Sequence, residues 1–265
     1  KCGAFTKAQY AIDELHNTNV ASWNALIAGL SNHGLVAEAL KSFECMRKRS
    51  ILPDAITFVC VLNACAKVGA LEKGNEIYAE AVREGDLAEK VCALNSALVN
   101  MYVKCGALTK ARNVFENSFD RDVVSWTTLI TGYTQCGHSE EALCCFEEMR
   151  AEGVTPDRIT LLSLLSACSS SSGLMDGQIL FDSLSRNSGI SPLLEHYTCL
   201  VHLFGRRGHL DKAHEFIKKL PLEFENCALW FTLLGACRQW GSIKLGQLAF
   251  HHTMEQRLFS SPESL

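Results

Sequence analysis

Apolar side chains along this chain recur with the spacing of amphipathic helices, and the predicted helices come in pairs. In the segment 20–54, a break at Gly34 separates two apolar stripes with helical spacing. The first stripe is Trp23, Leu26, Ile27 and Leu30, and the second is Ala39, Phe43 and Met46. No stretch with the two-residue alternation of a β-strand competes with this pattern. The sequence therefore predicts an all-α chain built from helical hairpins.

The segment 123–157 repeats the pattern and adds signals for where its helices begin and end. A break at Gly137 separates its two apolar stripes. We expect Ser139 to cap the second helix, because acidic residues follow it in the first turn. Gly153 is typical of the residue that ends such a helix.

An internal repeat of 103 residues organises the whole chain. Short blocks that begin at Lys1, Val20, Ala64 and Leu71 return at Lys104, Val123, Ala167 and Leu174. We divide the chain into units at 20–54, 55–91, 92–122, 123–157, 158–193 and 194–225. A partial unit at 1–19 precedes them, and residues 226–257 and a tail at 258–265 follow. Stacked helical hairpins of this length form an α-solenoid.

Composition and charge restrict the function only a little. Of the 265 residues, 48% are hydrophobic and 20% are charged, with a formal net charge of −4. No apolar run reaches the ~18–20 residues of a membrane span, so we expect no membrane association. An acidic total by itself argues against a nucleic-acid partner. In a repeat protein, however, acids can occupy the outer helices while sparse cations line the inner surface.

The thirteen cysteines do not predict a disulfide framework, because the chain is long and their number is odd. Several follow an alanine at one phase of the repeat, namely Cys65, Cys168 and Cys237. We expect them to act as small core residues in a reducing compartment. The chain begins at Lys1, so we also expect it to be a fragment or a processed form.

The blocks of the repeat resemble the pentatricopeptide repeat family. The standard repeat is represented by residues 123–133, 141–149 and 153–157. Residues 164–168 and 173–177 are similar to its long variant, and residues 101–106 and 111–115 to its short variant. Such alternation is typical of the plant PLS subclass. Residues 194–221 resemble the last short unit of that subclass, and residues 229–238 and 244–246 resemble the start of its C-terminal extension (E) domain.

This resemblance implies a right-handed α-solenoid superhelix of stacked helix-turn-helix repeats that binds single-stranded RNA, one base per repeat. It further implies RNA processing in a mitochondrion or chloroplast, above all site recognition for C-to-U RNA editing. The implied partners are single-stranded RNA and an editing deaminase or editing-complex protein acting in trans.

Short polar residues recur at the fifth position of the first helices, and acidic residues recur at the last position of the units. The fifth-position residues are Asn24, Ser96, Thr127 and Thr198, and the last-position residues are Asp54, Asp122 and Asp157. An Asp after a proline is also a common turn residue and helix cap, so Asp54 and Asp157 have a structural interpretation as well.

The pairing rules of the family assign a base to each pair. Asn24 with Asp54 resembles a uracil reader, and Thr127 with Asp157 resembles a guanine reader. Ser96 with Asp122 resembles a weaker guanine reader, Val59 fits a poor reader, and Thr198 would pair with Glu225. The implied target is U, any base, G, G, running 5′ to 3′ along the chain.

Two further columns of residues follow from the resemblance. Ala21 and Val124 occupy the second position, where family side chains wedge against the base. Lys67, Lys104 and Arg206 occupy the thirteenth position, as does Lys1, beside the RNA backbone. We interpret Trp23 and Trp126 as core residues between helices rather than as platforms for bases.

Residues for catalysis are sparse. His138-Ser139-Glu140 matches the first half of a zinc deaminase motif, but the chain has no Cys-x-x-Cys, so we interpret the match as coincidence. His214-Glu215 opens a His-Glu-x-x-His motif that Lys218 leaves incomplete. We expect no enzyme, no catalytic residue, no metal and no cofactor. The alternative function is a protein-binding helical scaffold like the tetratricopeptide repeats.

Overall fold

The computed structural model describes residues 19–83, 91–118, 121–170, 177–187, 189–221 and 226–260. Over these ranges the regular structure is helical, with no strand, which confirms the predicted all-α class. None of the helices in the described ranges has the length and apolar character needed to cross a bilayer. The chain forms two compact units, residues 1–132 and 133–265, and the helix α8 (Val123–Gln135) carries the boundary between them.

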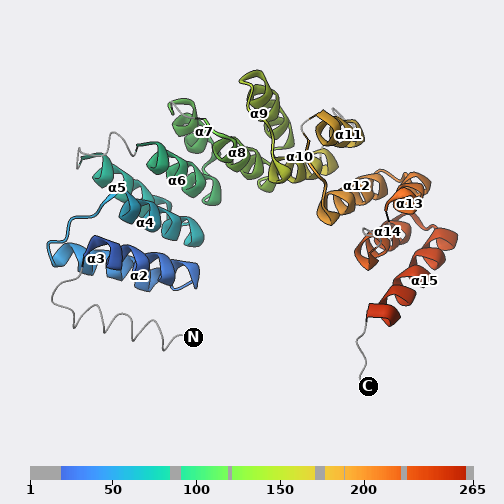
Figure 1. Ribbon diagram of the computed structural model, residues 1–265, viewed down its shortest axis with the longest axis horizontal. Coiled ribbons are helices and arrows are strands. Elements are labelled where there is room, and N and C mark those ends of the chain that lie inside the picture. The colour runs from blue at the N-terminus through green and yellow to red at the C-terminus, as the bar shows by residue number, and fades with distance from the viewer. Residues whose placement is uncertain are drawn as a thin grey trace. The chain divides into compact units, whose positions relative to one another are not determined.

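The first unit is a stack of helical hairpins with two layers (Figure 1). One layer holds the first helices α2 (Val20–Asn32), α4 (Ala55–Val68) and α6 (Val91–Lys104). The other holds the second helices α3 (Val36–Lys48), α5 (Leu71–Arg83) and α7 (Leu108–Glu116). Within this unit α4 packs against both α2 and α6, and each second helix packs against the first helix of its own hairpin. This is the stacking of an α-solenoid.

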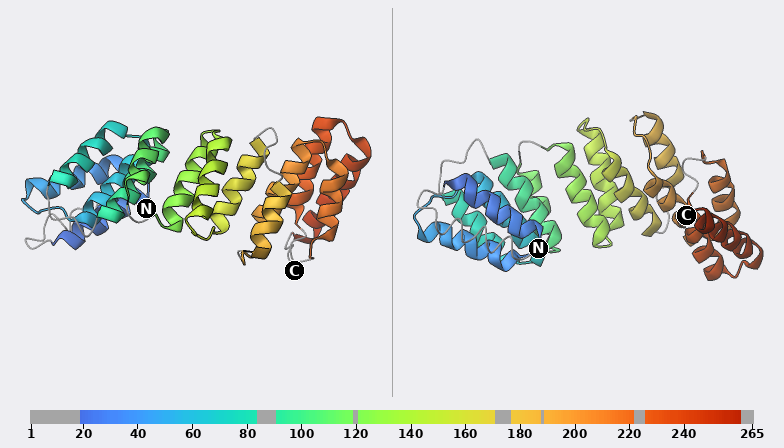
Figure 2. Two further views of the ribbon diagram at one scale, coloured as in Figure 1. Left: turned by 90° about the horizontal axis from the view of Figure 1, so that it is seen from above. Right: turned by 60° about the horizontal axis from the view of Figure 1, so that its bottom comes forward.

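The second unit repeats the arrangement (Figure 2). Its helices are α9 (Ser139–Ala151), α10 (Arg158–Ser170), α11 (Gly177–Asn187), α12 (Leu194–Arg206), α13 (Leu210–Lys219), α14 (Cys227–Trp240) and α15 (Ile243–Ser260). The first helix α12 packs against the first helices α10 and α14, and α15 packs along α14. The first helices of each unit therefore present equivalent positions side by side.

A glycine in the left-handed conformation builds the turn inside those hairpins whose turn lies in the described ranges. Gly34 has a φ of 80° and Gly208 a φ of 77°. The next residue donates its backbone N–H to a carbonyl five residues earlier, from Leu35 to Leu30 and from His209 to Phe204, both at 2.9 Å. This bond satisfies an orphan carbonyl at the end of the first helix and reverses the chain. The same glycine recurs at Gly69, Gly106, Gly137 and Gly241.

The prediction that Ser139 caps α9 is wrong. Ser139 is the first residue of the helix and is buried, and the N-cap residue is His138, whose side chain makes no capping hydrogen bond. Leu35 and His209 stand at the same place before α3 and α13, also without a side-chain cap. The turn at the preceding glycine already aligns the backbone for the second helix, so these helices begin without a capping side chain.

The largest buried side chains join neighbouring helices. Trp23 and Trp126 are fully buried, and the ring of Trp126 lies 4.5 Å from the ring of Phe115 in an edge-on contact. Cys65 and Cys168 are also fully buried. The predictions of core tryptophans and core cysteines are therefore confirmed at these positions. Close packing at a constant phase keeps the same positions of the first helices at the surface.

Candidate nucleic-acid interface

The fifth residue of α2 touches the residue that precedes α4. Nδ2 of Asn24 donates a hydrogen bond to Oδ1 of Asp54 at 3.0 Å. These residues meet because α4 packs beside α2. Asn24 is 7% exposed, so its amide is held at the edge of the packed layer rather than moving freely in solvent. The structure thus brings together the two residues that the sequence pairs in the unit 20–54.

Thr57 completes this polar cluster, and the sequence reasoning did not single it out. Its backbone N–H donates to Oδ1 of Asp54 at 2.8 Å. Its hydroxyl lies 2.6 Å from Oδ1 of Asn24 and 2.9 Å from Oδ1 of Asp54, so the hydroxyl proton can bond to either oxygen. These contacts fix which end of the Asn24 amide is the donor. The NH₂ group has two hydrogens, so one donor is left for a ligand after the bond to Asp54.

The last-position acids also cap the next first helix. Oδ1 of Asp122 accepts from the backbone N–H of Ser125 at 2.8 Å, and Oδ1 of Asp157 accepts from that of Thr160 at 2.7 Å. The caps at Asp54 and Asp157 confirm the structural interpretation of these two acids, and Asp122 has the same role. A capping bond also holds each carboxylate in one orientation at the start of a first helix. The sequence signal for Thr57 is its spacing from Asp54: a polar residue three positions after an N-cap Asp can complete a capping box.

Ser96 reaches the Asp122 cap through a second serine. Its Oγ lies 3.4 Å from Oγ of Ser125, the residue whose backbone is bound by Asp122. Ser125 is buried, while Ser96 is half-buried. Ser96 and the cap of the following helix are therefore neighbours, although the contact is less direct than that between Asn24 and Asp54.

The other two predicted pairs stay predictions. Thr127 lies in the compact unit 1–132 and Asp157 in the compact unit 133–265. The hydroxyl of Thr198 donates to the carbonyl of Leu194 in its own helix at 2.9 Å. Its predicted partner Glu225 lies outside the described residues, as does Lys1.

The second position of the first helices is exposed. Ala21 is exposed, and Val124 has 60% of its surface accessible. The sequence reasoning missed Ile56 and Ile159 at the same position of α4 and α10, with 59% and 60% accessible. Aliphatic side chains that recur in solvent at one position of the repeat differ from singly scattered ones, which need no explanation. The signal is a branched apolar residue two places after the capping Asp.

The three described cations at the thirteenth position differ in their surroundings. Nζ of Lys67 donates to the carbonyl of Ser31 at 2.9 Å and to Oδ1 of Asn32 at 3.1 Å. Lys67 therefore stabilises the negative end of α2 in addition to carrying its charge to the surface. Lys104 and Arg206 are exposed and form no ion pair with any described residue.

Acidic side chains on the second helices are paired with cations. Examples are Glu76 with Lys73 on α5, Glu147 with Arg150 on α9, and Glu215 with Lys219 on α13. Exposed pairs of this kind contribute little stability. Each pair is neutral overall, so these pairs do not determine how the net charge of −4 is divided between the two helix layers.

The half-motif of a zinc deaminase has no completed site around it. His138 lies 3.3 Å from the carboxylate of Glu141, and both side chains are exposed. Across the residues with a described structure, no group of three or more His, Cys, Asp or Glu side chains is arranged to hold a metal ion.

Comparison with known proteins identifies the repeat. The profile described as "PPR repeat family" matches residues 18–67 and 121–170, and the profile described as "PPR repeat" matches residues 56–86 and 195–222. The chain is 38% identical over 260 residues to the chloroplastic pentatricopeptide repeat-containing protein CRR2 of Arabidopsis thaliana, covering 97% of this chain and 38% of that protein. It is 35% identical over 249 residues to the mitochondrial pentatricopeptide repeat-containing protein At3g53360 of the same plant, covering 94% and 32%. The chain therefore spans about a third of the length of these relatives.

The structure is also similar to that of a pentatricopeptide repeat protein. The crystal structure of the pentatricopeptide repeat protein PPR10 in complex with an 18-nucleotide psaJ RNA element superposes with a TM-score of 0.80. The two chains are 20% identical, and the match covers 95% of this chain and 37% of that one. The chain belongs to the pentatricopeptide repeat family.

Proposed function

We propose that this chain binds single-stranded RNA along its first helices and recognises one base per repeat. The observation that carries the proposal is the contact between Asn24 and Asp54, oriented by Thr57. It provides an amide donor and a carboxylate acceptor at fixed positions beside each other. A donor next to an acceptor is complementary to the Watson–Crick edge of a base.

The proposed target is U, any base, G, G, read in the 5′ to 3′ direction. The readers are Asn24 with Asp54 for uracil, Ser96 with Asp122 for guanine, and Thr127 with Asp157 for guanine. The exposed row at the second position, which includes Ala21, Ile56, Val124 and Ile159, would contact the faces of the bases. Lys67, Lys104 and Arg206 would lie near the phosphates.

For the unit that begins at Leu194, we propose Asn226 as the last position in place of Glu225. Asn226 directly precedes α14, and its Oδ1 accepts from the backbone N–H of Ala228 at 2.9 Å. Asp54, Asp122 and Asp157 hold the equivalent place before α4, α8 and α10. An amide has both a donor and an acceptor, whereas a carboxylate only accepts. We therefore expect Thr198 with Asn226 to prefer a different base from the repeats that carry an Asp at this position.

We further propose that the chain is a PLS-subclass protein whose residues 226–257 begin an extension domain. Its role would be site recognition for C-to-U editing in a mitochondrion or chloroplast. The support is the alternation of standard, long and short blocks together with relatives named for both organelles. The deamination itself would be carried out by a deaminase or an editing-complex protein in trans.

Fluorescence anisotropy with labelled RNA tests the base reading. RNA that contains U-N-G-G should bind more tightly than a scrambled RNA of the same composition at the same salt concentration. A protein-binding scaffold has no reason to distinguish the two, so equal dissociation constants would reject the proposal and favour the scaffold.

A further inference from the structure

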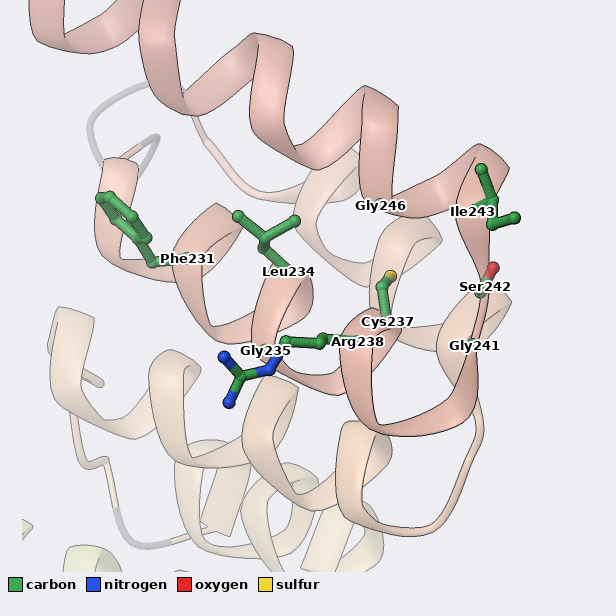
Figure 3. A pocket seen from close by; sticks show the side chains of 9 residues that line it. All are labelled: Phe231, Leu234, Gly235, Cys237, Arg238, Gly241, Ser242, Ile243 and Gly246. Atoms are coloured by element: carbon green, nitrogen blue, oxygen red, sulfur yellow. The ribbon is translucent and has the colours of Figure 1, made fainter.

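The fifth position of α14 carries an aromatic residue, Phe231. The equivalent residues of the preceding first helices are either short and polar (Asn24, Ser96, Thr127 and Thr198) or aliphatic (Val59 and Leu162). The side chain of Phe231 has 40% of its surface accessible. Figure 3 shows the ring standing out from the N-terminal part of α14. An aromatic ring cannot read a base edge through hydrogen bonds, but it offers a face on which a base can stack.

A groove lies beside this ring, between α12 and α14 of the second unit. Its volume is about 310 Å³. Its lining comes from His202 and Arg206 on α12 and from Phe231, Thr232, Gly235, Ala236 and Gln239 on α14. The positions are the fifth, ninth and thirteenth of the repeat and their neighbours, the same face that carries Asn24 and Lys67 on earlier helices. A Cβ on Gly235 would meet only open space, so the groove is not closed at that point.

The polar side chains of the groove suit a nucleotide. Arg206 is exposed, forms no ion pair with any described residue, and stands at the thirteenth position proposed to meet phosphates. Burial and the neighbouring Arg206 lower the pKa of His202, so its ring is neutral near pH 7. Nδ1 of His202 lies 3.2 Å from the hydroxyl of Ser169, so the opposite ring nitrogen, Nε2, is the one that could bond to a ligand. A cation, a polar edge and an aromatic face thus meet in one groove.

We propose that this groove binds the nucleotide directly 3′ of the one read by the repeat that begins at Leu194. The base stacks on Phe231 and the phosphate lies at Arg206. In the order of the first helices this is the seventh nucleotide of the target. Stacking tolerates every base, so the site adds affinity without adding sequence preference. The proposal rests on the proposed function, because it needs RNA to follow the first helices in the 5′ to 3′ direction.

The test compares three RNAs that share the first six nucleotides. One ends at the sixth nucleotide, one adds a seventh nucleotide, and one adds an abasic seventh nucleotide that keeps the phosphate. We expect the intact seventh nucleotide to bind most tightly, by about 5-fold to 150-fold over the abasic one, which is the range that ~1–3 kcal/mol per stacked base gives. All four bases should give similar gains. Phe231→Ala should remove the difference between the intact and abasic RNAs, and Phe231→Tyr should keep it.

Phe250→Ala is the matched control, because Phe250 is an exposed phenylalanine on α15 outside the groove. It should leave all three affinities unchanged. Equal binding of intact and abasic RNA by the unmodified chain would overturn the proposal, and so would a difference that survives Phe231→Ala. In that case Phe231 would serve another partner, such as a protein. If the preference for U-N-G-G holds while the seventh base has no effect, only this inference fails. If no RNA binds selectively, both fail.

Discussion

The amide of Asn24 donates to the carboxylate of Asp54 across 3.0 Å, and the same carboxylate oxygen caps α4. One residue therefore serves both as a structural cap and as a proposed reader of uracil. The two roles depend on different chemical properties of the side chain. Capping needs an oxygen that accepts from the backbone, whereas base reading depends on whether the side chain only accepts or can also donate.

Substitutions at Asp54 separate these roles. Asp54→Ala removes the cap and should lower the free energy of unfolding by about 1 kcal/mol. Asp54→Asn keeps a good cap, so its unfolding free energy should stay within about 0.5 kcal/mol of the unmodified chain while the preference for uracil is lost. Urea denaturation and RNA binding measure the two effects. An Asp54→Asn chain that still prefers uracil would contradict the assignment of the reader.

If the cations at the thirteenth position contact phosphates, removing one should change the salt dependence of RNA binding. Lys104→Ala should weaken RNA binding similarly for all sequences and reduce the slope of log K against log[salt] by about 0.7, the value for one phosphate contact on a single strand. Anisotropy titrations over a range of salt concentrations measure this slope. Lys41→Ala on the outer helix α3 is the control, because Lys41 is exposed in the other layer. If the two variants give the same slope, the thirteenth-position column has no special role.

We expect a glycine-to-alanine substitution to have opposite effects on stability at a turn glycine and at a glycine inside a helix. Gly208 has a φ of 77°, and a Cβ there would lie 3.3 Å from the ring of Trp240, so Gly208→Ala should destabilise the chain by about 1–2 kcal/mol. Gly235 sits inside α14 with open space around it, so Gly235→Ala should stabilise by about 0.5–1 kcal/mol. Thermal or urea unfolding gives both signs. A stabilising Gly208→Ala would show that the turn does not need the left-handed residue.

His214, in the compact unit 133–265, should make the folded chain less stable at acidic pH. Burial, together with the nearby Lys218 and His252, lowers the pKa of His214 below its ordinary value of 6.5, against the smaller opposing effect of Asp211 and Glu215. The unfolded chain therefore binds more protons at this site, so the stability from the neutral ring is present above pH 6.5 and is lost as the pH falls below it. Unfolding free energies measured from pH 7.5 to pH 5 should show this decline.

The variant His214→Gln should flatten that decline, since it removes the titrating group. Its control is His33→Gln, which changes an exposed histidine in the first unit. A pH profile that is equally steep with and without His214 would assign the acid sensitivity to other groups.

The periodicity of the sequence was sufficient to predict the helical hairpins and the buried tryptophans. Trp23 and Trp126 lie at one phase of an apolar stripe, and a stripe of that width has to face other helices. The cap at Ser139 could not be predicted correctly from local propensity. The geometry of the turn at Gly137 already starts the helix, and a serine in its first turn is then simply buried.

The candidate site was predictable as a pattern but not as a set of contacts. The recurrence of short polar residues pointed to Asn24 and Asp54, yet nothing in the spacing showed that the hydroxyl of Thr57 also lies against Asn24. The resemblance placed Lys67 beside the RNA backbone, but it did not show that the ammonium group also binds the end of α2. Such contacts join residues more than thirty positions apart, so they depend on how α2 and α4 pack and not on either segment alone.

The most direct test of the account exchanges the base that one repeat reads. Thr127→Asn gives the unit 123–157 the fifth and last residues of the unit 20–54, while Thr128→Asn makes the same change one position away, where the side chain bonds to its own helix at Val124. Dissociation constants for U-N-G-G and U-N-G-U should show that the unmodified chain and Thr128→Asn prefer U-N-G-G, and that Thr127→Asn prefers U-N-G-U. If Thr127→Asn keeps the original order of preference, the fifth position does not read the base and the central claim is contradicted.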